Sequence, residues 1–402
     1  MNWTVEKAMH EFESLSSAAF SKREWLKVPI FRHGAQLLYS HRFKSEGIDG
    51  SLQKAFGQGY LFGNSYSSTE KVKVGVVAAV PGGRRPYLFS NYSRNSTGQD
   101  TGYLVREDDP KDDLKIWEAS EYFGSSNLFE PYFHERTKQQ YIDGALNRNN
   151  PVQILEEERR AIWSDKTPPD IMLSIGTGIQ ADMGGTTKSA GKRLKTAKKL
   201  IPKGLRGKIA VGLDMVQSTL DCDRQLDEFV SSTKWDSHLS SVCHRLDIGL
   251  HGRPPNLDDV DSIPLLKHQD LYLRQEPGVY LNKDYKSAHK HVRVVAKRLI
   301  AALFYFELTS LKDGKCAGVL HCRLSSAMRD QFRHLLSAGP AFRVCHRVSG
   351  KGWMIHDLEP DFDAHNFSSK IEFEERSDRR AIEIHMPRWS SWERISGFTA
   401  PQ

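Results

Sequence analysis

The sequence is poor in cysteine and has no apolar run long enough to cross a membrane. Its five cysteines are an odd and sparse set, which argues against a disulfide framework. The longest apolar runs, residues 74–81 and 299–306, are far shorter than the ~20 residues of a spanning helix. The N-terminus, MNWTVEKAMHEFESL, is amphipathic and acidic, unlike a secretory leader with its basic start and apolar centre. We therefore expect an intracellular protein that is kept reduced.

Recognisable motifs for cofactors and metals are missing as well. GQGYLFG, residues 57–63, has the spacing G-x-G-x-x-x-G without a clear strand before it, so it does not match a dinucleotide-binding loop. Three cysteines lie near two histidines, but their spacing is not that of a zinc site, and adjacent side chains on a strand point to opposite faces. These residues are Cys316, Cys322, Cys345, His321 and His346. We expect neither a cofactor nor a metal ion.

The formal charge of +7 is unevenly distributed along the chain. The stretch from Lys188 to Lys208 contains nine Lys or Arg residues and no acidic residue. Two interpretations stay open for it: a solvated surface segment, or a peripheral contact with anionic membrane head groups. We expect no nucleic-acid partner, because no aromatic residues interleave with the basic ones to stack on bases.

Periodicity and turn signals predict an α/β region followed by a β-rich region. Helices are expected over residues 4–20 (capped by Asn2 or Thr4), 114–123, 194–201, 213–232 and 285–307, and one opens at Pro151 after an Asn150 cap. Strands are expected over 71–80, 86–90 (joined by the turn PGGRR), 140–142 and 170–175, the last as a buried strand. Beyond Leu308, short alternating runs predict strands alone: AGVLHCRL, AFRVCHRV, GWMIHDL, KIEFEE and AIEIHM. This order favours an α/β domain with an all-β appendage.

The stretch YIDGALNRNNPV, residues 141–152, places one carboxylate among small and helix-capping residues. Asp143-Gly144 alone is typical of a turn, but an acid placed in a loop by an extended segment can also serve as a base. Gly144 and Ala145 are small, so another segment can approach closely. About twenty residues after Val152, the apolar run DIMLSI ends in Gly176-Thr177-Gly178. Together these features favour a functional site.

These residues resemble the patatin-like phospholipase family. The resemblance rests on Asp143-Gly144-Ala145, on Asn149-Asn150-Pro151-Val152 and on Ser174-Ile175-Gly176-Thr177-Gly178. Ile116-Trp117-Glu118-Ala119 and the segment Phe129–Tyr132 look like the stretch that precedes this motif in the family. The similarity runs from about Trp3 to Glu307, and the multidomain fungal members look most similar.

The resemblance implies a lipid acyl hydrolase with a three-layer α/β domain over residues 1–307 and a β-rich domain over residues 308–402. In this family a serine in Gly-x-Ser-x-Gly attacks the ester, and the aspartate of the Asp-Gly-Gly/Ala motif, here Asp143, is its general base. A serine hydroxyl is a poor nucleophile until a positioned base takes its proton. A carboxylate with an ordinary pKa of ~3.9 must be partly desolvated to do so. The implied substrates are phospholipids or acylglycerols. The implied location is the cytoplasm, with peripheral association with membranes.

The chain departs from the family at the nucleophile. No Gly-x-Ser-x-Gly occurs in the 402 residues, and the family's Gly-rich oxyanion segment is missing too. Met1 falls just after the position of that serine in the family, which favours an N-terminally incomplete sequence. The segment Glu121–Asn127 also stands where relatives have an Arg-Ala-Thr-Ser-Ala-Ala-Pro-like sequence. We therefore predict that the chain alone is inactive and poorly soluble. The alternatives are a lipid- or protein-binding pseudoenzyme and a basic interaction or nucleic-acid-binding protein.

Overall fold

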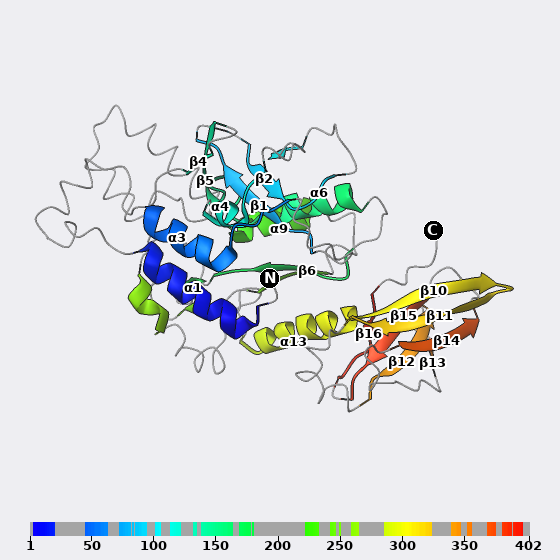
Figure 1. The fold of residues 1–402 in the computed structure, drawn as a ribbon. Helices are drawn as coiled ribbons and strands as arrows, with labels where there is room; N and C mark the ends of the chain where they lie inside the picture. Colours follow the sequence, from blue (N-terminus) through cyan, green and yellow to red (C-terminus); the bar gives the residue numbers. More distant parts are fainter. Residues whose placement is uncertain are drawn as a thin grey trace, which may run out of the picture. The chain divides into compact units, whose positions relative to one another are not determined.

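The structure is a computed structural model that mixes helices and sheets, as the sequence predicts (Figure 1). It describes residues 3–20, 45–62, 72–81, 83, 85–94, 101–105, 113–121, 132–134, 138–163, 169–177, 179–180, 222–232, 242–246, 249–250, 259–264, 285–323, 339–346, 352–355, 368–374, 380–387 and 389–396. The chain forms two compact units. The first comprises Met1–Lys166, Gly176–Trp235 and Gly249–Glu276; the second comprises Thr167–Ile175, Asp236–Ile248 and Pro277–Gln402.

The described residues near the start of the first unit include the helices α1 and α3. α1 spans Val5–Ala19, and the Thr4 hydroxyl caps it by accepting a hydrogen bond from the Lys7 N–H at 3.2 Å, which confirms the predicted helix and one of its two candidate caps. α3 spans Ser45–Phe56 and ends at Gly57, whose positive φ of 71° lets its N–H bond to the Gln53 carbonyl. The first glycine of GQGYLFG is therefore a helix terminator.

A five-stranded sheet in the order β3-β2-β1-β5-β4 forms the centre of the first unit. Its strands are β1 (Gly75–Ala79), β2 (Tyr87–Ser90), β3 (Leu104–Val105), β4 (Tyr132–His134) and β5 (Gln139–Asp143). β1 and β2 pair antiparallel, as predicted for the two strands joined by PGGRR. β5 confirms the predicted extended segment and pairs with the other edge of β1.

Helices pack on both faces of this sheet. They contact alternate residues of β1, which point to opposite sides. Val76 and Ala78 pack with Tyr141 and with residues at α4 (Ile116–Glu121), which begins two residues after its predicted start. Val77, between them, packs on the other face against Ile154 of α6 (Val152–Ile162). The segment Ile116–Ala119, singled out from the sequence, thus shares a core with the strand that leads to Asp143.

The rest of the described first unit consists of short elements. They are α5 (Ala145–Arg148), α9 (Cys222–Ser232), the parallel pair β7 (Ile179–Gln180) and β9 (Gly249–Leu250), and the 3-10 helix η3 (Val260–Ser262). α9 confirms the C-terminal half of the helix predicted over 213–232. The predicted helix at 194–201 and the basic stretch Lys188–Lys208 lie outside the described residues.

The second unit contains two antiparallel sheets that confirm the predicted C-terminal strands. The first is β10-β11-β14, formed by Phe304–Lys312, Lys315–Cys322 and Ser368–Glu374. The second is β13-β12-β15-β16, formed by Gly352–Met354, Ala341–His346, Arg380–His385 and Glu393–Arg394. Asp313 and Gly314, both with positive φ, make the two-residue turn between β10 and β11.

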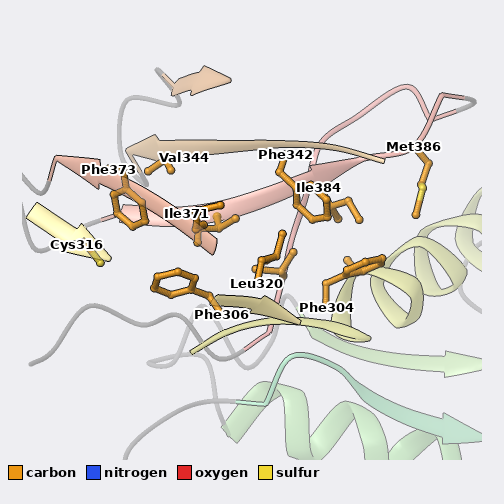
Figure 2. Packing of buried hydrophobic residues seen from close by; sticks show 13 residues of the cluster. Phe304, Phe306, Cys316, Leu320, Phe342, Val344, Ile371, Phe373, Ile384 and Met386 are labelled. Carbon is orange, nitrogen blue, oxygen red and sulfur yellow. The ribbon is translucent and has the colours of Figure 1, made fainter. Parts of the chain in front are cut away.

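The apolar faces of these two sheets pack against each other. Figure 2 shows Leu320 from one sheet directed toward Phe342 and Ile384 from the other. Phe304 and Phe342 meet edge to face with ring centroids 5.5 Å apart, a favourable aromatic geometry. The unit therefore has a sandwich core of its own.

The helix α13 (Tyr285–Ala302) precedes this sandwich, and it ends earlier than the predicted 285–307. β10 already begins at Phe304, because Phe304 and Phe306 alternate into the sandwich core. The second unit also contains a parallel pair, β6 (Met172–Ile175) and β8 (Cys243–Leu246). β6 confirms the strand predicted over 170–175, but the prediction that it is buried is wrong at Ile175, whose side chain is 73% exposed.

Candidate active site

Asp143 is the last residue of β5 and lies opposite Ala78, the next-to-last residue of β1. The strand is held in register by Tyr141, which is 1% exposed. The Tyr141 ring meets those of Tyr87 and Phe89 edge to face, at centroid distances of 5.3 and 5.0 Å. This aromatic cluster fixes the backbone two residues before the carboxylate, so the position of Asp143 is determined by the core.

Position 144 requires glycine because the backbone of β1 lies too close for a side chain, and not because the backbone angles of this residue are unusual. Its φ and ψ are −62° and −20°, which any residue adopts. However, a Cβ on this residue would lie 2.1 Å from the carbonyl oxygen of Val77 and 2.6 Å from its carbonyl carbon. The backbone of β1 occupies the place of a side chain here. This confirms the prediction that a small residue at 144 allows another segment to approach.

The carboxylate of Asp143 is partly buried and has one hydrogen bond within the described residues. The Ala145 N–H donates to Oδ1 at 2.9 Å, a bond two residues along the chain that is typical of an Asx turn. Burial raises the pKa of Asp143 above its ordinary value, and the hydrogen bond from Ala145 opposes part of that rise. Asp143 is therefore both a turn residue and a carboxylate of raised proton affinity.

The two asparagines after this turn bind α9 instead of capping α6. The Asn150 N–H donates to Gln225 Oε1 at 2.7 Å, and its side-chain amide donates to the Cys222 carbonyl at 3.0 Å. The Asn149 amide donates to Cys222 Sγ at 3.0 Å. The predicted Asn150 cap is therefore wrong: Pro151 is the N-cap, and its carbonyl accepts the first helical bond from Leu155. The Asn-Asn-Pro motif joins two helices near the Asp143 turn.

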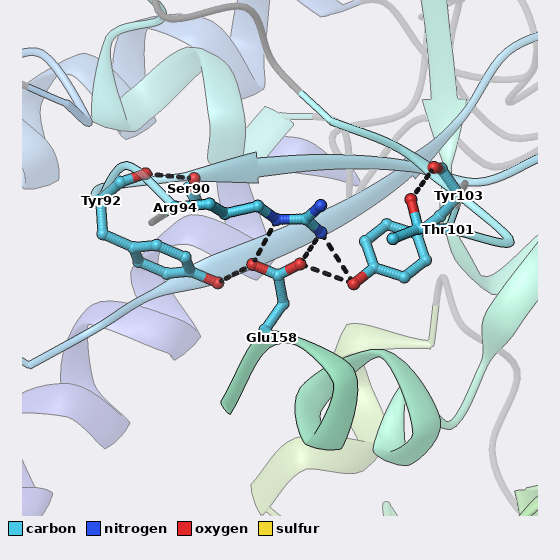
Figure 3. Close-up of polar contacts among 6 residues, drawn as sticks. All are labelled: Ser90, Tyr92, Arg94, Thr101, Tyr103 and Glu158. Atoms are coloured by element: carbon cyan, nitrogen blue, oxygen red, sulfur yellow. Dashed lines mark hydrogen bonds and ion pairs between the residues drawn. The ribbon is translucent and has the colours of Figure 1, made fainter. Parts of the chain in front are cut away.

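A buried polar cluster, formed by Glu158 with Arg94, Tyr92 and Tyr103, holds α6 against the sheet (Figure 3). Glu158 is 3% exposed and pairs with the Arg94 guanidinium. The Tyr92 and Tyr103 hydroxyls donate to its two carboxylate oxygens at 2.9 and 2.6 Å. Burial raises the pKa of each tyrosine to about 12, so both remain donors at neutral pH. Sequence reasoning missed this cluster, because its members are far apart in the chain and Glu158 falls in an ordinary run of charged helix residues.

Ser174, which the sequence grouped with Asp143, belongs to the second unit. There it lies beside Arg245 of β8, its register partner, and accepts a hydrogen bond from Arg245 Nη1 at 2.9 Å. Arg245 is 6% exposed, so this contact is internal to the β6–β8 pair. In the structure, the residues brought together around Asp143 are Gly144 and Ala145, with Asn149 and Asn150 close behind in sequence.

The described residues around Asp143 include no hydroxyl or thiol that hydrogen bonds to its carboxylate. No group of three or more His, Cys, Asp or Glu side chains suited to a metal ion occurs in the described part of the chain. Among the helices that the structure describes, none has both the length and the apolar character required to cross a bilayer. The arrangement thus offers a positioned carboxylate with a raised pKa.

Comparison with models of known protein families gives no match, and a search of curated proteins gives none either. The resemblance to patatin-like phospholipases therefore rests on the sequence motifs quoted above.

Proposed function

We propose that this chain is the aspartate-bearing part of a patatin-type lipid acyl hydrolase and that Asp143 is the general base of its serine–aspartate dyad. The observation that carries the proposal is the partly buried carboxylate, fixed by Gly144 against β1 and by the Ala145 N–H, with a raised pKa. Desolvation gives a carboxylate the proton affinity that a general base needs. Helices on both faces of the central sheet are in keeping with the three-layer α/β fold that belongs to this proposal.

In the proposed reaction, Asp143 accepts the proton of a serine hydroxyl while the serine oxygen bonds to the acyl carbonyl carbon of a phospholipid or acylglycerol. Asp143 then returns the proton to the alcohol oxygen as the ester C–O bond breaks. Water next gives a proton to Asp143 and attacks the acyl carbon, and the returning proton restores the serine as the fatty acid leaves. A single carboxylate therefore acts alternately as base and acid.

The nucleophile is not supplied by a Gly-x-Ser-x-Gly motif of this chain, because the 402 residues contain none. Loss of the nucleophile alone lowers turnover by roughly 10⁶ in a well-studied serine hydrolase. We therefore expect the chain by itself to give no measurable ester hydrolysis. The proposed setting is the cytoplasm, with lipid as substrate and a peripheral contact with anionic membrane through Lys188–Lys208.

The same missing motif favours a second candidate function, a pseudoenzyme that binds lipid or a protein partner without chemistry. Under this alternative, the Asp143 turn has a structural role only, holding the β5–α6 connection against β1. Vesicle binding by a mature protein that begins at Met1, without hydrolysis, would favour it.

Fluorophosphonate labelling of the purified chain tests the proposal, alongside a search of the transcript for an in-frame Gly-x-Ser-x-Gly upstream of Met1. We expect no labelling of the 402-residue chain and labelling of a product extended through such a motif. Absence of the motif from the transcript would overturn the hydrolase proposal in favour of the pseudoenzyme. Stoichiometric labelling of the 402-residue chain, lost in Asp143→Asn, would contradict the expected inactivity.

A further inference from the structure

The helix α13 is strongly basic. Its eighteen residues, YKSAHKHVRVVAKRLIAA, include five Lys or Arg and no Asp or Glu. Such a helix is attracted to anionic surfaces, and its binding also depends on how its apolar side chains are distributed. The structure gives that distribution for residues 292–302.

One side of α13 is fixed to the rest of the second unit. Val295 is 2% exposed and Ala301 is fully buried. Arg298 donates to the Arg394 carbonyl at 2.6 Å and to the Asp170 carbonyl at 3.1 Å. Lys297 lies over the Trp389 ring at 5.9 Å. The orientation of α13 is therefore set by these contacts.

Next to the buried Val295, α13 presents an uncovered apolar stripe. Val292, Ala296 and Leu299 follow one another at the i, i+4, i+7 spacing of a single helix face, and all three are exposed. Val292 retains 51% of its accessible surface and Leu299 retains 45%. Arg293, next to the stripe, is also exposed. An apolar stripe beside basic side chains is the pattern of a helix that lies in a lipid interface.

We propose that the Val292–Leu299 face of α13 docks on an anionic lipid surface. The apolar side chains would enter the boundary between head groups and acyl chains, while the exposed Arg293 beside them meets the lipid phosphates. A nucleic acid would satisfy the charges but leave Val292 and Leu299 in water, so lipid fits both features. The inference goes beyond the proposed hydrolase and does not rest on it.

The helix α1 provides a matched control within the same chain. It also exposes an apolar stripe: Val5 is 72%, Met9 46% and Phe12 62% exposed. However, α1 carries three glutamates, at positions 6, 11 and 13, against one lysine, at position 7. An anionic surface repels that charge, so the exposed apolar area of α1 alone should not bind it.

Sedimentation of the full chain with vesicles tests the proposal. Mixed phosphatidylserine–phosphatidylcholine vesicles should bind the chain, and phosphatidylcholine vesicles should bind it much more weakly. Arg293→Gln should weaken binding to the mixed vesicles roughly fivefold, the effect of one basic charge near an anionic membrane. The double variant Val292→Gln/Leu299→Gln should weaken it by at least roughly tenfold through lost apolar burial. Because these side chains are largely exposed, circular dichroism should show unchanged folding.

Three further variants make the result decisive. Phe12→Gln should bind as the wild type does, and so should Asp143→Asn, because binding requires no ester cleavage. Replacing the basic residues of Lys188–Lys208 with glutamine should leave the effect of the α13 double variant intact. The proposal is overturned if mixed vesicles do not bind the chain or if Phe12→Gln weakens binding as much as the double variant does. Loss of binding only with the Lys188–Lys208 variant, or binding of an oligonucleotide in place of vesicles, also overturns it.

Discussion

Replacing Gly144 with alanine tests the close approach that holds Asp143 in place. The added Cβ would lie 2.1 Å from the Val77 carbonyl oxygen, whereas real Cβ atoms essentially never come within 3.0 Å of such an atom. The turn and β1 must therefore separate by roughly 1 Å, and the obstacle is strand backbone that cannot rotate away. The substitution also disturbs the pairing of Asp143 with Ala78.

The expected cost follows from this geometry. Overpacking of a well-packed site costs about 1–3 kcal/mol, and a backbone obstacle places Gly144→Ala at the upper end of that range. In a unit of this size each kcal/mol lowers the Tm by about 2–4 °C, so a cost of about 3 kcal/mol corresponds to a decrease of roughly 6–12 °C.

Thermal unfolding followed by circular dichroism measures this decrease, and hydrogen exchange localises it. Peptides that contain β1 and β5 should exchange faster in Gly144→Ala, while peptides of the C-terminal sandwich should not change. Gly50→Ala is the control, because no atom lies within 4 Å of its added Cβ and the residue lies in α3. Alanine should stabilise that helix by about 0.5–1 kcal/mol. Equal Tm values for Gly144→Ala and the wild type would refute the reasoning.

Three further predictions follow from the buried groups. Glu158→Gln leaves the partly buried Arg94 guanidinium without its counter-charge and should destabilise the chain to urea by about 3 kcal/mol, whereas Glu157→Gln on the same helix should cost less than ~0.5 kcal/mol. Because the pKa of Asp143 is raised in the folded chain, the free energy of unfolding falls as pH rises above the ordinary carboxyl range. Asp143→Asn should therefore be more stable than the wild type near neutral pH. The difference between their free energies of unfolding should narrow as pH falls. Burial raises the pKa of Cys243 and of Cys345 to about 11, so iodoacetamide at about pH 8 should modify neither thiol before unfolding, as mass spectrometry would record.

Each of these predictions has a clear contrary result. Equal urea midpoints for the two glutamate variants would mean that the Glu158 cluster does not hold α6. A stability difference between Asp143→Asn and the wild type that is the same at all pH values would contradict desolvation of the carboxylate. Rapid alkylation of Cys345 in the native chain would show that β12 is not packed as described.

Most of the described helices and strands could be predicted from the sequence. Thr4 and the spacing after it define α1, and alternation defines the C-terminal strands. The helix predicted over 285–307 is too long, because the apolar pattern of AALFYFE is compatible with a helix and with a strand. Pairing with β11 makes Phe304 and Phe306 part of a strand. Tertiary contacts decide such short apolar runs.

The candidate site could be predicted from the sequence only in part. Asp143 could be placed after an extended segment, because that feature is local. The close approach that Gly144 allows was also predicted, but the segment that approaches could not be identified, since it is Val77 of another strand. Asn150 looked like a helix cap, yet its bonds go to α9, more than seventy residues away in the chain. The Glu158 cluster was missed for the same reason: its partners meet only in three dimensions.

The central claim is that Asp143 is a general base. Its most direct test is the rate of ester hydrolysis by a protein that contains both an in-frame Gly-x-Ser-x-Gly segment and this chain. Wild type and Asp143→Asn would be compared, because asparagine keeps the acceptor for the Ala145 N–H and removes the base. We predict that Asp143→Asn loses at least about 10²-fold in kcat, the contribution of a positioned base, while Tm does not fall. Equal kcat values for the two proteins would contradict the account.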